Sequence, residues 1–419
     1  MFLALTSFFL YNIGMNKNKK IIVAMSGGVD SSVVAALLVK KGYNVTGMFA
    51  VNYEGQDKFG NSCWRDDYED ALRISAKLGI KLLRLNFVEE YRKKVLEYTY
   101  NEYNKGRTPN PDVMCNKFIK FDVWIKKIKE LGYDKIATGH YARLSPRISN
   151  FQFLISKQFS ISNFKLLQAK DKNKDQTYFL HQLSKEQLKD VLFPLGKYTK
   201  NHVRKLAEKF DLVTKDKEES MGICFVGEVP MKEFLKDKVK AKKGDILLSP
   251  HARGGVRGSG SSGEVVGTHD GLPFYTIGQR IAVDARRHSE LLAYRQAGVS
   301  ESKEIPKQVR DDSGKKPLFI VGKNIKKNEL TIGFADDPLL FKKEIKIKNM
   351  HWVAGQELKL PLKCCFRLRH RQTLEKGVLS RHNTQYLILN TDTAQRAVTS
   401  GQFAVIYKGK VCLGGGEIV

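Results

Sequence analysis

The sequence predicts an α/β protein with added β domains: a doubly wound parallel sheet in the N-terminal half, a small β-rich middle domain and a C-terminal β-barrel. In the first part of the chain, short apolar runs alternate with segments of helical apolar spacing. This alternation is typical of parallel strands joined by right-handed helical crossovers. From Leu318 onward, short apolar segments recur between turns at roughly regular spacing, which indicates a barrel or a sandwich.

The elements of the N-terminal half follow one another in order. We expect parallel strands at residues 21–24, 44–51, 81–87 and 135–138. We expect helices at residues 33–39, 66–78, 89–103, 119–131, 185–191 and 200–210, with a break at 106–111. The ligand of such a sheet binds beyond the carboxyl ends of the strands, which is where Ala50 and Gly139 fall.

Composition divides the chain into five parts. Residues 15–217 hold the α/β elements, 218–283 form the middle domain and 317–419 form the barrel. Residues 284–316 are highly charged and lack periodicity, so we expect a disordered or loosely helical insertion there. Residues 1–14 are apolar but shorter than the about 20 residues of a membrane span. We expect them to be an extension outside the fold, with a peripheral membrane anchor as the alternative.

Charge and cysteine usage indicate the kind of partner and the compartment. The 419 residues carry 72 Lys+Arg against 44 Asp+Glu, a net charge of +28, so a polyanion such as a nucleic acid is the expected partner. The six cysteines show no C-x-x-C pair and no histidine at metal-ligand spacing. They predict a reducing, cytoplasmic setting without a disulfide scaffold or metal site.

The stretch IIVAMSGGVDSS, residues 21–32, indicates an anion site. Gly27 and Gly28 lack the Cβ atoms that would block a ligand from the backbone, and Ser26 and Ser31 add hydroxyl donors. The helix that follows adds free N–H groups and the positive end of its dipole. No Lys follows the glycines, so this is not the G-x-x-x-x-G-K-[ST] pattern. A plain strand-to-helix connection is the alternative.

A second candidate site follows the break at residues 106–111. Pro109 and Pro111 restrict the backbone there, and Asp112 and Cys115 share a face if a helix begins at Pro111 or Asp112. The helix N-terminus and the nearby lysines 117 and 120 should lower the pKa of the Cys115 thiol. The alternative is a capping aspartate followed by a buried structural cysteine.

Cys224 is the second cysteine of interest. It lies between Ile223 and Phe225 in a segment, residues 222–227, that we expect to be a short strand. A core cysteine of that strand is therefore the alternative to a reactive thiol. We expect Cys63, Cys364, Cys365 and Cys412 to be structural.

Several long motifs occur in an order that resembles the tRNA-specific 2-thiouridylase family, a branch of the pyrophosphate-loop ATPases. They are SGGVDSS, GRTPNPDVMCN, ATGHYAR, NKDQTYFL, GICFVGE, GLPFYTIGQR, MHWV, RLRHRQ and VCLGGGEI. The resemblance covers most of the chain and implies a Rossmann-like domain related to the adenine nucleotide alpha hydrolases, with a tRNA-binding barrel. It also implies an ATP site, with Mg²⁺, at Ala24, Met25, Ser26, Gly27, Gly28, Val29, Asp30, Ser31, Ala50 and Gly139.

The same resemblance implies roles for residues that act on tRNA. Asn110, Pro111 and Asp112 match contacts to the target base, with Asp112 a candidate acid or base. Cys115 matches the nucleophile and Cys224 the cysteine that carries a persulfide. Further tRNA contacts match Lys174, Asp175, Gln176, Arg369 and His370. The family commonly has Tyr at the position of His370 and Met at that of Ala50.

The implied reaction is ATP-dependent 2-thiolation of the wobble uridine. The implied partners are the glutamine, glutamate and lysine tRNAs and a persulfide-delivering sulfur carrier or cysteine desulfurase. A membrane is not among the implied partners. One alternative is another pyrophosphate-loop adenylating enzyme, such as a tRNA lysidine synthetase or an amidotransferase-type synthetase, which would need neither thiol. A non-catalytic tRNA-binding relative is the other.

Overall fold

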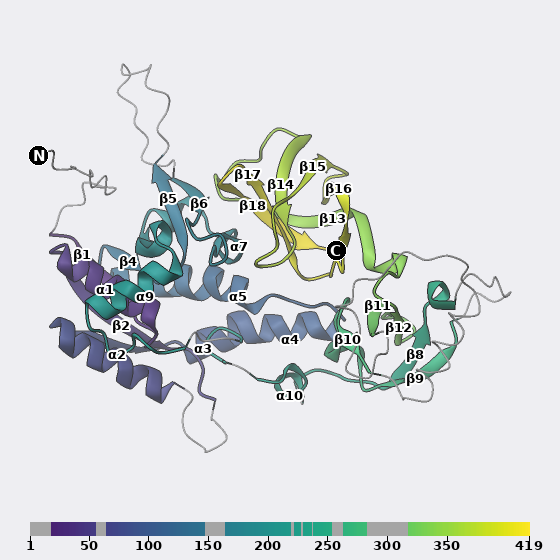
Figure 1. The fold of residues 1–419 in the computed structure, drawn as a ribbon, viewed down its shortest axis with the longest axis horizontal. Helices are drawn as coiled ribbons and strands as arrows, with labels where there is room; N and C mark the ends of the chain where they lie inside the picture. The colour runs from purple at the N-terminus through teal and green to yellow at the C-terminus, as the bar shows by residue number, and fades with distance from the viewer. Residues whose placement is uncertain are drawn as a thin grey trace, which may run out of the picture.

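The computed structural model describes residues 18–55, 64–146, 164–218, 222–227, 229–236, 238–253, 263–282 and 317–419. Three sheets organise these residues, with an α/β domain at the left of Figure 1, a barrel above the centre and a smaller sheet at the right. The predicted fold class is confirmed: a parallel α/β sheet, a β-rich middle domain and a C-terminal β-barrel. The predicted extension at 1–14, the predicted insertion at 284–316 and Cys63 lie outside the described residues.

The first sheet is parallel and has the strand order β3-β2-β1-β4-β7. Its strands are β1 (Lys20–Ala24), β2 (Asn44–Val51), β3 (Leu82–Asn86), β4 (Lys135–Ala137) and β7 (Val191–Leu192). Side chains alternate between the two faces, so Ile21 and Val23 enter one core while Ile22 enters the other. Both faces are therefore covered, as expected of a doubly wound sheet.

Helices cover the two faces. On one face lie α1 (Val29–Lys40), α2 (Arg65–Leu78) and α9 (Lys200–Lys209), which pack on each other. The other face carries two longer helices that each contain a π-helical stretch. The first consists of α3 (Val88–Tyr91), η1 (Arg92–Leu96) and α4 (Glu97–Asn104), and the second of α5 (Pro111–Met114), η2 (Cys115–Val123) and α6 (Trp124–Glu130).

Two helix predictions need correction. The helix expected at 119–131 begins at Pro111, because Asn110 caps it and a proline fits the first helical position. The helix expected at 185–191 is only one turn, α8 (Lys185–Leu188), because Val191 leaves it to pair with β4.

The middle sheet includes two strands, β11 and β12, that the sequence analysis predicts for the barrel. Its order is β10-β11-β12-β8-β9, with β8 (Gly244–Leu248), β9 (Val265–His269), β10 (Arg280–Ile281), β11 (Leu318–Asn324) and β12 (Glu329–Gly333). The prediction that the barrel begins at 317 is wrong, because β12 pairs in parallel with β8 and their apolar side chains share one core. The other domain boundaries stay predictions.

The third sheet closes into the barrel. Strands β13 (Phe341–Trp352), β16 (Tyr386–Arg396), β15 (Glu375–Arg381), β14 (Leu362–Arg367), β17 (Phe403–Lys408) and β18 (Val411–Ile418) follow in this order, and β13 also pairs with β18. The hairpin of β5 (Ala142–Pro146) and β6 (Phe164–Gln168) joins through β18. In the described part of the chain, no helix is long and apolar enough to cross a bilayer.

Candidate active site

A cavity of about 510 Å³ opens beyond the carboxyl ends of β1, β2 and β4. It is lined by residues from several separate parts of the chain: the glycine loop after β1, the end of β2, the start of α2, the helix that begins at 111, the segment after β4, residues 176–179 and the turn at 222–227. Parallel strands place their carboxyl ends at one edge, which explains why these segments meet. The predicted location of the site at this edge fits the geometry.

The glycine loop is fixed by its own hydroxyls and by a neighbouring helix. Ser31 Oγ accepts from the backbone N–H of Ser26 at 3.2 Å and donates to the carbonyl of Gly28 at 3.1 Å. Gly27 has φ +70°, and a Cβ there would lie 2.2 Å from the carbonyl oxygen of Asp67 at the start of α2. Glycine is therefore required at position 27 by backbone conformation and by close packing.

The N-terminus of α1 faces this loop without a side-chain cap. Gly28 is the N-cap residue and no side chain bonds to the first helical N–H groups. Asp30 Oδ1 in the first turn accepts from Lys200 Nζ at 2.7 Å and Tyr141 Oη at 2.8 Å. An uncapped N-terminus beside a cavity of this size suits a phosphate-bearing ligand such as ATP.

Most of the residues predicted to bind ATP line the cavity, and three do not. Those in its wall are Ala24, Met25, Ser26, Asp30, Ser31, Ala50 and Gly139. Gly27, Gly28 and Val29 shape the loop behind them, with Val29 in the core. Within the described residues, no cluster of three or more His, Cys, Asp or Glu side chains could hold a metal ion.

The segment before Cys115 is held by the barrel. Asn110 accepts from the backbone N–H of Val113 at 3.3 Å, and its amide donates to Gln402 Oε1 at 3.3 Å. Gln402 Nε2 in turn donates to the carbonyls of Thr108 and Pro109 at 2.9 and 3.1 Å. The start of the helix that carries Asp112 and Cys115 is therefore fixed by a residue far along the chain.

The turn that carries Cys224 is fixed on both sides. The expected strand at 222–227 is instead a tight turn, with one bridge between Ile223 and Gly227 and a left-handed φ of 68° at Phe225. The backbone N–H of Cys224 donates to Asp112 Oδ1 at 3.0 Å, and Tyr91 Oη donates to the Cys224 carbonyl at 2.7 Å. A turn in place of a strand directs Cys224 into the cavity.

The two cysteines meet at this turn. Cys115 and Cys224 lie close enough for each thiol to shift the pKa of the other, and neither is in a disulfide. Cys115 is 0% exposed, whereas Cys224 is half-buried in the cavity wall. The Cys224 thiol is thus the one that a substrate can reach.

The low thiol pKa predicted for Cys115 is found at Cys224 instead. The prediction for Cys115 is therefore wrong. Burial, together with the neighbouring Cys224 thiol, raises the pKa of Cys115 well above its ordinary value. The neighbouring Cys115 thiol and the nearby charge of Lys120 lower the pKa of Cys224 to about 7, against the effect of burial. Burial also raises the pKa of Asp112, although the Cys224 N–H and Lys120 oppose it.

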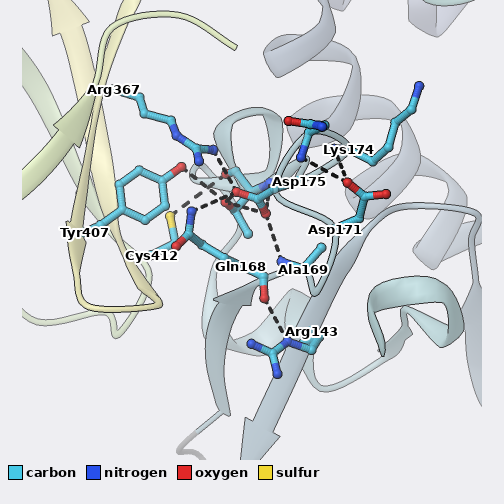
Figure 2. A network of polar contacts seen from close by, with 11 residues as sticks. Arg143, Gln168, Ala169, Asp171, Lys174, Asp175, Arg367, Tyr407 and Cys412 are labelled. Atoms are coloured by element: carbon cyan, nitrogen blue, oxygen red, sulfur yellow. Dashed lines mark hydrogen bonds and ion pairs between the residues drawn. The ribbon is translucent and has the colours of Figure 1, made fainter. Parts of the chain in front are cut away.

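The predicted tRNA contacts at 174–176 differ in exposure. Asp175 is 1% exposed and forms an ion pair of 2.7 Å with Arg367 from the barrel (Figure 2). It also accepts from the backbone N–H of Ala169 and the hydroxyl of Thr177. The charge of the Asp175 side chain is therefore enclosed, and a tRNA contact at this residue stays a prediction. Lys174 and Gln176 are partly exposed, and Gln176 lines the cavity.

Arg369 and His370 lie outside the cavity wall. Arg369 is exposed, and its guanidinium donates to the carbonyl of Arg396 at 2.6 Å. The ring of His370 packs on Phe179, a cavity residue, at 4.6 Å between centroids. Burial, with the charges of Arg371 and Arg367, lowers the pKa of His370 to about 4. His370 is therefore neutral at neutral pH.

Sequence reasoning missed Tyr91, Lys120, His140 and Gln402 as site residues. Lys120 and His140 line the cavity, while Tyr91 and Gln402 hold the segments of Cys224 and Asn110. His140 could have been found from its place directly after the predicted strand at 135–138. No local signal marked Tyr91 or Gln402, since their partners are distant in sequence.

A parallel sheet whose first strand runs into a glycine loop and an uncapped helix, with a reactive thiol in the same cavity, defines a nucleotide-binding protein of the pyrophosphate-loop class. Three protein-family models match the chain and describe its domains more closely. The tRNA methyl transferase HUP domain model matches residues 19–228, its PRC-barrel domain model 232–288, and the aminomethyltransferase beta-barrel domain model 342–418.

Relatives match along nearly the whole chain. The sequence is 39% identical over 405 residues to tRNA-specific 2-thiouridylase MnmA 2 of Aliarcobacter butzleri, covering 96% of this chain and 99% of that protein. It is 38% identical over 400 residues to MnmA of Halalkalibacterium halodurans, covering 95% and 94%. The chain belongs to the tRNA-specific 2-thiouridylase family, a family of pyrophosphate-loop ATPases whose membership implies the use of ATP.

Proposed function

We propose that this protein catalyses ATP-dependent 2-thiolation of the wobble uridine of tRNA. The observation that carries the proposal is that Cys115 and Cys224 lie near each other beside a cavity that the glycine loop also lines. An adenylating enzyme without sulfur chemistry has no use for two thiols there. Two neighbouring thiols are what a persulfide transfer followed by disulfide formation needs.

The glycine loop serves the activating half of the reaction. A uracil C2 carbonyl is a poor electrophile, so its oxygen attacks the α-phosphorus of ATP, becomes adenylated and releases pyrophosphate. Ser26, Ser31 and the N-terminus of α1 would hold the phosphates. Mg²⁺ bound to ATP needs only one or two carboxylates, and Asp30 and Asp67 line this part of the cavity.

The thiols serve the transfer half. The outer sulfur of a Cys224 persulfide attacks C2, and AMP leaves with the former C2 oxygen. Cys115 then attacks the Cys224 sulfur, so that a Cys115–Cys224 disulfide forms and the bond to the transferred sulfur breaks with its electron pair on 2-thiouridine. A dithiol reductant must restore both thiols. Asp112, beside Cys224, is placed to exchange protons during these steps.

The substrates and partners follow from this reaction. The target uridine leaves its stack to enter the cavity, as is usual for base-modifying enzymes. Asn110 and Pro111 lie at the start of the helix that carries Asp112 and Cys115. The net charge of +28 favours tRNA phosphates. Glutamine, glutamate and lysine tRNAs are the proposed acceptors, and a sulfur carrier or cysteine desulfurase of the cytoplasm delivers the persulfide.

The test is mass spectrometry of tRNA nucleosides after incubation with ATP, Mg²⁺ and a persulfide donor. We expect 2-thiouridine with the wild-type protein and none with Cys224→Ser or Cys115→Ser, while both variants still bind tRNA. Full thiolation by Cys224→Ser would overturn its assigned role. ATP-dependent pyrophosphate release without any 2-thiouridine, unaffected by both substitutions, would favour another adenylating enzyme. tRNA binding without pyrophosphate release would favour a non-catalytic relative.

A further inference from the structure

Lys120 owes its position to the π-helical stretch of its helix. In an α-helix, a residue five positions after Cys115 would lie about 140° around the axis from it. Segment η2 is π-helical and is followed by an N–H of Trp124 that bonds to the carbonyl of Ile119, five residues back. Bonding of this kind brings residue i+5 above residue i. Lys120 therefore lies over Cys115 and lines the cavity.

The Lys120 ammonium lies beside the turn that carries the reactive thiol. Its Nζ is 5.2 Å from the centre of the Phe225 ring, over the next residue of the turn, and Lys120 and Cys224 line the same cavity. The geometry is that of a cation held on an aromatic face beside a sulfur. One lysine is thus close to both sulfurs of the proposed reaction.

The other ionisable groups around the thiols supply no positive charge. Asp112 and Tyr91 bond to the backbone of Cys224. Burial, together with the charge of Lys120, lowers the pKa of His140 well below its ordinary value, so His140 is neutral. Burial alone would lower the pKa of Lys120, but the charges of Cys224 and Cys115 raise it. Among the described groups that face the thiols, Lys120 is the cation.

We propose that the Lys120 ammonium keeps the Cys224 sulfur ionised as a thiolate, so that Cys224 rather than Cys115 takes up sulfur. The proposal rests on the proposed function. In that step the Cys224 thiolate attacks the outer sulfur of a donor cysteine persulfide. The donor S–S bond breaks, the donor leaves as a thiolate with the electron pair, and a new persulfide forms on Cys224. The ionised persulfide of Cys224 then faces the Lys120 ammonium.

The test measures ionisation of Cys224 without ATP, tRNA or a sulfur donor. The protein is pulsed with iodoacetamide across a pH series that spans the ordinary thiol range, then digested with trypsin. Alkylation is quantified on the peptide 218–232, in which Cys224 is the only cysteine. Wild type is compared with Lys120→Met, with Lys120→Arg and with Lys117→Met as a matched control. Lys117 lies on the same segment but donates to Gln182 at 3.0 Å.

We expect a wild-type midpoint near 7. In Lys120→Met the midpoint should rise toward about 8.5, so that alkylation at neutral pH falls on the order of tenfold. Lys120→Arg and Lys117→Met should keep a low midpoint. An equal shift in Lys117→Met, or an unchanged midpoint in a folded Lys120→Met, would overturn the proposal.

The wild-type curve decides the matter even if Lys120→Met does not fold, because an ordinary wild-type midpoint of about 8.5 would itself overturn the proposal. The result is also separate from the proposed function. A low midpoint that depends on Lys120, together with no 2-thiouridine in the tRNA assay, would refute the thiolation and leave the ion pair standing.

Discussion

The hydroxyl of Tyr91 donates a hydrogen bond of 2.7 Å to the carbonyl of Cys224, which lies far away in sequence. The Tyr91 ring is 0% exposed and meets Phe225 edge-to-face at 5.8 Å between centroids. Tyr91 therefore orients the cysteine turn from the side opposite to Asp112.

Replacing Tyr91 by Phe removes this bond and keeps the ring. We expect a loss of about 1 kcal/mol in the free energy of unfolding and a several-fold slower formation of the Cys115–Cys224 disulfide under a mild oxidant. Urea unfolding and peptide mapping measure the two effects. Tyr103→Phe is the control, since its hydroxyl contacts the Met231 sulfur at 3.6 Å. Equal oxidation rates in both variants would contradict the positioning role.

The two glycines of the loop should respond differently to alanine. Gly27→Ala forces a left-handed φ on a side chain that also meets Asp67, so we expect a cost of about 1–3 kcal/mol and weakened ATP binding. At Gly28 φ is −93° and the nearest atom to an added Cβ is Ser26 Oγ at 3.5 Å, so the fold should tolerate Gly28→Ala. Thermal unfolding without nucleotide checks the order, and the reverse order would refute this account.

Arg367→Met should destabilise the protein strongly. It leaves the enclosed charge of Asp175 without its ion pair, at a cost of about 3–5 kcal/mol in urea unfolding. Adding Asp175→Asn to Arg367→Met should recover much of this loss, since no buried charge remains. Arg381→Met is the control because its ion pair with Glu357 is exposed and contributes about 0–1 kcal/mol. No recovery in the double variant would show that the packing of Arg367 matters more than its charge.

Arg369 and His370 should differ in how they affect tRNA binding. Arg369→Ala removes an exposed cation, so the slope of log affinity against log salt should fall by about 1. His370→Phe keeps a ring over Phe179 and removes no charge at neutral pH, so the slope should stay unchanged. Filter binding of tRNA over a range of salt measures both. An equal drop in slope for His370→Phe would mean that the imidazole is charged when tRNA binds.

The sequence predicted those parts of the fold that depend on local pattern. The apolar run at 44–51 matches strand β2 residue for residue. Long-range pairing was not accessible: β12 joins the middle sheet through its partner β8, and β11 joins through β12, which no local feature of 318–333 reveals. The apolar run ICF around Cys224 resembles a short buried strand, but the left-handed backbone of Phe225 makes it a turn.

The dependence on long-range packing also explains why the thiol pKa values could not be predicted from the sequence. Helix position and nearby lysines predicted a low pKa for Cys115, and both features are present. Its full burial outweighs them, and burial depends on the packing of other helices over that face. Cys224 has no helix dipole, yet the neighbouring Cys115 thiol and the charge of Lys120 lower its pKa. The two cysteines were predicted as a pair through family resemblance, whereas the division of ionisation between them is a property of the fold.

The pairing of β6 with β18 bears on the order in which this chain can fold during synthesis. The hairpin β5–β6 leaves the ribosome early, but the strand that covers its edge is the last one in this sequence. Until then β6 exposes unpaired backbone groups that could pair with another chain. Nascent chains that stop before Val411 should therefore be the ones that depend most on chaperones.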